Sequence, residues 1–130
     1  MKTKNIKQTV SFNAKPEDVY DIIMNPKKHS ALTGSKVKMS NKPNGKFEVF
    51  EGYAKGYNIQ LEKVKKIIQA WHFAEEGWPD DHFSICTFVF EPTAKGTKMI
   101  FTQTGIPEHK AKSLAEGWKQ YYWEPIKAFL

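Results

Sequence analysis

The sequence contains a single cysteine, Cys86, and no apolar run longer than three residues. A lone cysteine excludes an internal disulfide framework. Runs such as "FVF" and "YYW" are far too short to span a bilayer, which takes about 20 apolar residues. The N-terminal "MKTKNIKQTV" is charged and lacks the apolar segment of a secretory signal. These absences predict a reduced, cytoplasmic protein with no membrane partner.

The common catalytic and metal-binding patterns are also missing. There is no glycine-rich phosphate loop, no nucleophile elbow and no His-Glu-x-x-His sequence. The segment "HFAEEGWPDDHF" offers two histidines and four carboxylates, but they flank a turn and nothing fixes their convergence, so we interpret it as a solvated loop. His29 and His109 lie beside lysines and are predicted at the surface, and Cys86 inside "SICTFVF" is predicted to be a small buried hydrophobe. The sequence therefore predicts no enzyme, no metal and no cofactor.

The net charge is +6, with basic residues gathered in "MKTKNIK", "NPKKHSALTGSKVKMSNK" and "LEKVKK". No zinc-finger spacing, recognition-helix signature or RNP-type aromatic motif accompanies them. We interpret the lysines as a solvated basic face and predict no nucleic-acid partner. If this face does bind a partner, an acidic protein fits it as well as a nucleic acid does.

The chain has the length of a single domain, residues 1–130, and begins with a strand followed by two short helices. In "NIKQTVSFNA", Ile6, Val10 and Phe12 share one face of a strand with the polar Gln8, which must find a hydrogen-bond partner or line a cavity. In "KPEDVYDIIMNPKKHSALTG", each proline suits a first helical position, and the final glycine supplies a stop.

Residues 36–104 show the pattern of strands separated by turns. Breakers fall at 43–45, 77–81 and 92–96, a spacing that favours an antiparallel meander joined by hairpins. Residues 46–64 are predicted as one strand-like stretch, in which Gly52 and Gly56 mark bulges or bends of a curved sheet rather than breaks.

The chain closes on a predicted helix from about Glu108 to the C-terminus. At 100° per residue, one face carries Ala111, Leu114, Trp118, Tyr121, Tyr122 and Phe129. Trp118 lies near the centre of this stripe, whereas Trp123 projects to the opposite side and is predicted to be exposed or to cover a loop. Pro125 predicts a kink or an early end, because proline removes a helical hydrogen bond.

This order of elements resembles the START-like helix-grip fold of the SRPBCC superfamily. The segments "GKFEVFEG", "QAWHFAEEGWPDDHFSICTFVFE", "TGIP" and "EGWKQYYWEPIKAF" are similar to the C-terminal domain of the activator of heat-shock protein 90 ATPase, over about Asn13 to Phe129. The resemblance implies an α+β fold in which a curved antiparallel sheet wraps around a long C-terminal helix, with two short helices after the first strand.

Two functions follow as hypotheses. The first, implied by the resemblance, is a non-enzymatic binding module for a heat-shock protein 90 chaperone, with Lys119, Trp123 and Lys127 as its surface. The activators that the sequence resembles have a separate N-terminal domain that makes much of the chaperone contact. We therefore expect weak binding to the chaperone and modest stimulation of its ATPase. The alternative is a carrier or sensor of a small hydrophobic ligand held between sheet and helix. The candidate cavity residues are Gln8, Trp71, Phe88, Phe90, Phe101, Trp118 and Tyr122, although the same aromatics could fill the interior as an ordinary core.

Overall fold

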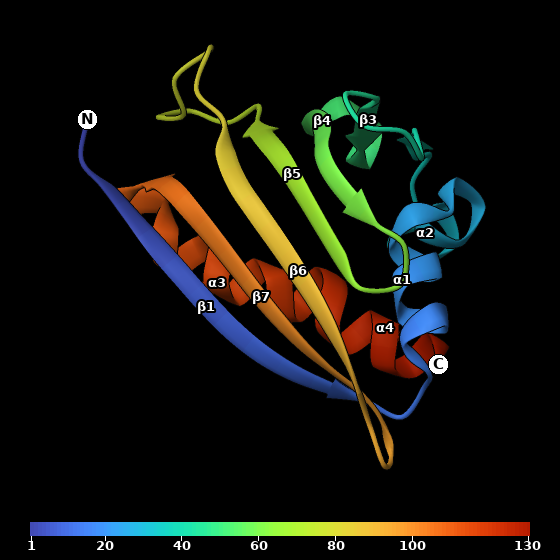
Figure 1. The fold of residues 1–130 in the computed structure, drawn as a ribbon. Helices are drawn as coiled ribbons and strands as arrows, with labels where there is room; N and C mark the ends of the chain where they lie inside the picture. Colours follow the sequence, from blue (N-terminus) through green and yellow to red (C-terminus); the bar gives the residue numbers. More distant parts are fainter.

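The structure, a computed structural model that describes residues 1–130, is a curved antiparallel sheet of seven strands with a helical segment along its concave face (Figure 1). The strands are β1 (Thr3–Phe12), β2 (Lys38–Met39), β3 (Lys46–Val49), β4 (Ala54–Glu62), β5 (Lys66–Phe73), β6 (Ser84–Thr93) and β7 (Gly96–Pro107). Their order in the sheet is β1-β7-β6-β5-β4-β3-β2. The helices are α1 (Pro16–Met24), α2 (Pro26–Thr33), α3 (Ala111–Trp118) and α4 (Glu124–Phe129), with short turns between. The predicted α+β helix-grip fold is confirmed.

The first and last strands lie side by side, which places β1 at the edge of the sheet next to β7 (Figure 1). Gln8 is opposite Phe101 and Phe12 is opposite Thr97. Residues directly opposite each other on neighbouring strands share one face of the sheet, so Gln8 and Phe101 both point to the concave side, toward the C-terminal helix. None of the helices is long and apolar enough to cross a membrane.

The two early helices begin and end where the sequence predicts. Pro16 is the first residue of α1, and the Asn25 side chain accepts the amides of Lys27 and Lys28, at 2.9 and 3.1 Å, at the start of α2. Gly34 closes α2 with a φ of 75°, in the left-handed region that favours glycine. The apolar stripe of α1 is buried as expected and comprises Val19, Ile22 and Ile23.

The stretch 46–64 is not one strand. The chain reverses after β3 at Phe50–Gly52 (η1), where Phe50, Glu51 and Gly52 have φ angles of 51°, 57° and 89°. The β3 and β4 strands then pair with each other, so Gly52 marks a break, and the prediction of a continuous stretch is wrong. Gly56 does lie inside β4, where a Cβ would approach the carbonyl oxygen of Ala70 to 1.7 Å. Before β3, the strand pattern that the sequence shows from residue 36 onward is reduced to the two residues of β2.

The C-terminal helix contains a π-helical turn, η3 (Lys119–Trp123), between α3 and α4. The amide of Glu124 donates to the carbonyl of Lys119, five residues earlier, so this turn holds one residue more than an α-helical turn. Pro125 follows directly and has no amide hydrogen to donate. The predicted irregularity at Pro125 is therefore present just before it, but the helix does not end early and continues to Phe129.

The extra residue in η3 rotates the side chains that follow by about 100° relative to a regular α-helix. Trp123 and Ile126 turn into the core, with exposures of 2% and 0%. Tyr121 and Phe129 are 54% and 55% exposed. The prediction that Trp123 points away from the core is therefore wrong, as is the placing of Tyr121 and Phe129 on the buried face.

Candidate functional site

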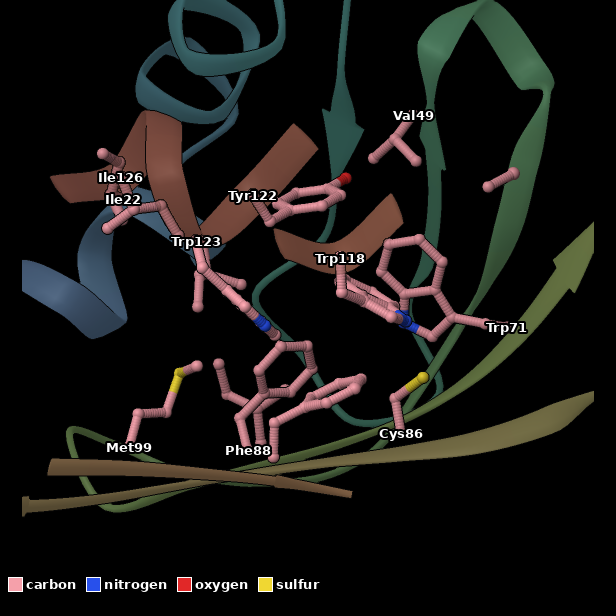
Figure 2. Close-up of a cluster of buried hydrophobic side chains, with 14 of the residues drawn as sticks. Ile22, Val49, Trp71, Cys86, Phe88, Met99, Trp118, Tyr122, Trp123 and Ile126 are labelled. Atoms are coloured by element: carbon pink, nitrogen blue, oxygen red, sulfur yellow. The ribbon is translucent and has the colours of Figure 1, made fainter. Parts of the chain in front are cut away.

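The space between sheet and helix is packed with aromatic side chains (Figure 2). The rings of Trp118 and Trp123 stack with centroids 5.4 Å apart at 16°, and Phe101 lies against both, at 4.6 and 5.1 Å. Phe88 borders Trp118 and Trp123 at 6.2 and 6.4 Å. Phe90 is also buried but contacts Tyr20 at 5.8 Å. Most of the predicted cavity residues therefore contact other core side chains.

Three glutamines from different strands support this aromatic core. Each accepts a hydrogen bond from a buried indole N–H: Gln8 from Trp123 at 2.6 Å, Gln103 from Trp118 at 2.7 Å, and Gln69 from Trp71 at 2.9 Å. Their amide groups donate in turn to the carbonyl of Ala115, to Ser84 Oγ and to Asn58 Oδ1. No buried side-chain nitrogen or oxygen is left without a partner. Gln8 thus has the partner that its position required.

Gln69 and Gln103 were missed by the sequence reading. Both occupy inward positions of strands whose neighbouring residues on that face are apolar, which is the same signal that singled out Gln8. An indole N–H buried without an acceptor is costly, so a core with several tryptophans needs inward polar residues.

His29 is buried, and its prediction as a surface residue is wrong. Its Nδ1 lies 2.9 Å from the carbonyl oxygen of Ile23, and its Nε2 lies 3.0 Å from the hydroxyl of Tyr122. A carbonyl only accepts, so Nδ1 carries the proton, and Nε2 accepts from the tyrosine hydroxyl. Burial lowers the pKa of His29 to about 4. The neutral ring therefore joins α2 to the π-helical turn.

The loop after β5 is tied together by its histidines. The carbonyl of His82 accepts from the indole of Trp78 at 2.8 Å and from Nδ1 of His72 at 3.0 Å. His82 Nε2 donates to the carbonyl of Gly105 at 2.6 Å. Trp78 is buried, so the loop is not fully solvated as predicted, although Glu76, Asp80 and Asp81 are exposed. No group of three His, Cys, Asp or Glu side chains is placed to hold a metal ion.

Cys86 is fully buried, as predicted, and burial raises the pKa of its thiol well above the usual value. His109 is exposed, also as predicted.

A small apolar pocket of about 140 Å³ opens at one side of the helix, between α3, η3, η1 and β5. Its lining consists of Phe50, Tyr53, Trp71, Phe73, Glu75, Ser113, Leu114, Gly117, Trp118, Tyr121 and Tyr122. Of the predicted cavity residues, Trp71, Trp118 and Tyr122 line this pocket, and Gln8, Phe88, Phe90 and Phe101 do not.

Glu75 is the only ionisable acid or base in the lining apart from the tyrosines. One carboxylate oxygen accepts the hydroxyl of Tyr53, and the other lies 3.4 Å from Nζ of Lys110. Burial, together with the neighbouring Glu75 carboxylate, raises the pKa of Tyr53. The pocket therefore has a mostly aromatic wall and a carboxylate at its edge.

The family model of "Activator of Hsp90 ATPase homolog 1-like protein" matches residues 13–130. The chain belongs to this family. It is 33% identical over 126 residues to an activator of 90 kDa heat shock protein ATPase homolog from Dictyostelium discoideum, covering 96% of this chain and 32% of that protein. It is 29% identical to the human activator homolog 1, covering 90% of this chain and 34% of that protein. The chain thus spans about a third of the length of these relatives.

Solved structures agree on the fold of this activator-family chain. An HSP90 activator from Plasmodium falciparum matches with a TM-score of 0.87 and 24% identity, over 96% of this chain and 94% of that one. A protein from Mesorhizobium loti matches with a TM-score of 0.81 and 20% identity, over 96% and 95% of the two chains.

The predicted partner surface of the activator-family chain is altered by the π-helical turn. Trp123 lies in the core and presents no surface to a partner, so that candidate is withdrawn. Lys119 and Lys127 are exposed on the helix, and Lys127 Nζ lies 3.9 Å from the carboxylate of Glu124.

Proposed function

We propose that this chain is a cytoplasmic, non-enzymatic binding module for a heat-shock protein 90 chaperone, formed by residues 1–130 as one domain. The observation that carries the proposal is the family match over residues 13–130. The Dictyostelium and human relatives are named as activators of the 90 kDa heat shock protein ATPase. Since the chain corresponds to about a third of their length, we expect weak binding and modest stimulation of the ATPase.

The exposed lysines of the C-terminal helix are the candidate contact surface. Lys119 and Lys127 lie on a chain of net charge +6, and this charge favours encounter with an acidic partner surface. Binding through such groups weakens with salt, because exposed charges are screened beyond roughly 8 Å at physiological ionic strength.

A pull-down and a coupled ATPase assay with the chaperone from the same organism test the proposal. The double variant Lys119→Glu/Lys127→Glu is compared with Lys7→Glu/Lys98→Glu, which reverses two exposed lysines on the outward face of β1 and β7. Both change the net charge equally. We expect the helix variant to weaken binding about fivefold or more and the sheet variant to leave it nearly unchanged. Absence of binding by the wild type refutes the chaperone function, and equal loss in both variants refutes the helix as the surface.

We propose a second function, the binding of a small ligand in the apolar pocket between α3, η3, η1 and β5, called here the pocket beneath η3. The pocket volume of about 140 Å³ and its eight apolar side chains support it. A cavity of about this size in another protein holds one benzene molecule, so the bound group is small and not a long acyl chain. Titration with toluene tests for saturable binding, with the NMR signals of the Trp71 and Trp118 indole N–H groups as the readout. Unshifted signals would remove the support for a carrier.

A further inference from the structure

The lining of the pocket beneath η3 favours a cation over a neutral apolar ligand. We propose that this pocket binds a trimethylammonium group. The inference rests on the second proposed function, that the pocket holds a small ligand, and names the chemistry of that ligand.

Aromatic rings make up most of the wall. Seven of the 11 lining residues are aromatic, and Leu114 is the only aliphatic side chain among the apolar ones. Several of the rings stand at steep angles to one another: Phe50 meets Tyr121 at 74° and Tyr122 at 82°, and Trp71 meets Tyr122 at 85°. Only Trp71 and Phe73 are stacked, at 27°. The rings therefore enclose the space from several directions and do not form one stack. A box of this kind attracts quaternary ammonium groups, because the ring faces carry negative charge density.

The charge at the edge of the pocket has the sign that a cation requires. Glu75 lines the pocket, and no lysine or histidine does. Lys110 pairs with one oxygen of this carboxylate from outside the lining, at 3.4 Å, and so neutralises part of its charge. Removing Lys110 should then strengthen the attraction for a cation, and removing the charge of Glu75 should weaken it. A purely hydrophobic ligand would respond to neither change.

The shape of the pocket fits a small head group whose remainder stays outside. The floor is buried, with Trp71, Trp118 and Tyr122 at 2%, 4% and 5% exposure, while Tyr53 and Tyr121 at the mouth are 42% and 54% exposed. A volume of about 140 Å³ suffices for a trimethylammonium group but not for a chain attached to it. The group can therefore come from a free small molecule or from the head group of a lipid.

The test compares choline with its neutral carbon analogue, in which a carbon atom replaces the nitrogen. Both are titrated into the wild-type chain, with sodium chloride matching the ionic strength, and the indole N–H signals of Trp71 and Trp118 are followed by NMR. We expect choline to bind about fivefold more tightly than the neutral analogue. The indole signal of Trp78, which lies outside the pocket, serves as the internal reference.

Variants at the mouth separate cation binding from apolar contact. Tyr121→Leu keeps an apolar side chain but removes a ring, and Glu75→Gln removes the charge; each should weaken choline binding about threefold to fivefold. Lys110→Met should tighten it about twofold or more. Tyr57→Leu, at an exposed tyrosine of β4 outside the pocket, is the matched control and should have no effect.

The outcomes separate the two levels of the proposal. Equal affinity for choline and its neutral analogue would overturn the proposal that the pocket prefers a cation, and would leave a pocket for apolar ligands. Unshifted Trp71 and Trp118 signals with choline, the analogue and toluene overturn both. If choline binds more tightly than its analogue, the protein is then sedimented with phosphatidylcholine vesicles. Co-sedimentation that free choline reverses identifies a lipid head group as the ligand. Choline binding without vesicle binding identifies a free small molecule.

Discussion

The substitution Trp123→Ala tests the π-helical turn most directly. A regular α-helix places this tryptophan on the outer face, where truncation costs little. In the structure it is 2% exposed, stacks on Trp118, contacts Phe101 at 5.1 Å and donates its indole hydrogen to Gln8. The substitution therefore removes core packing and leaves a core acceptor without its partner.

The expected cost follows from the buried area. A tryptophan buries about 150 to 250 Å², which at about 25 cal/mol per Å² gives about 4 to 6 kcal/mol. Measured truncations of buried Phe and Trp cost about 3 to 5 kcal/mol, and we expect Trp123→Ala to fall in this range. Tyr121→Ala is the matched control, since its side chain is 54% exposed, and it should cost less than about 1 kcal/mol.

Urea denaturation followed by far-UV circular dichroism measures both values. With a slope of about 2 kcal/mol per molar urea, Trp123→Ala should lower the midpoint by about 2 M, and Tyr121→Ala by less than about 0.5 M. If Tyr121→Ala lowers the midpoint more than Trp123→Ala does, the helix is regular at this point, and the rotation of side chains that we attribute to η3 is refuted.

Further predictions concern the buried polar groups. Burial lowers the pKa of His29 from 6.5 to about 4, so as the pH falls the unfolded chain binds this proton before the folded chain does. The free energy of unfolding should therefore be highest above about pH 6.5 and should fall by on the order of 3 kcal/mol toward pH 4. Urea titrations of His29→Gln should lack this loss. Tyr122→Phe removes the donor to His29 and should cost about 1 to 2 kcal/mol in the same assay. Gln103→Leu leaves the Trp118 indole unpaired and should cost about 1 to 3 kcal/mol. Cys86 should react with a thiol reagent only after urea unfolding, since it is fully buried and its pKa is raised.

Local chemistry allowed much of the fold to be predicted. Pro16, Asn25 and Gly34 act within a few residues of themselves, so the start and stop of the early helices follow from the sequence alone. The alternation of apolar residues likewise gave the inward face of β1, including Gln8. The reversal after β3 was missed because Phe50 and Glu51 adopt positive φ angles that their side chains do not favour.

The candidate site was predicted less completely, because its parts come from segments far apart in the chain. Trp71 and Trp118 were named, but the glutamines that accept their indole hydrogens, Gln69 and Gln103, were not. Phe50 and Glu75 reach the pocket only through η1 and the loop after β5, whose positions depend on packing against the C-terminal helix.

The sequence by itself determined the start and stop of the early helices and the inward face of β1, because these depend on short-range periodicity and on residues that start or end an element. The family followed from the resemblance of the segments between residues 13 and 129. Only the tertiary structure decided that Trp123 of the C-terminal helix is buried as well as Trp118. A π-helical turn places both Trp118 and Trp123 against the sheet, and the hydrogen bond from Trp123 to Gln8 spans 115 residues of sequence. Packing of both indoles favours this turn over a regular helix, and no pattern within the helix reports a partner so distant in the chain.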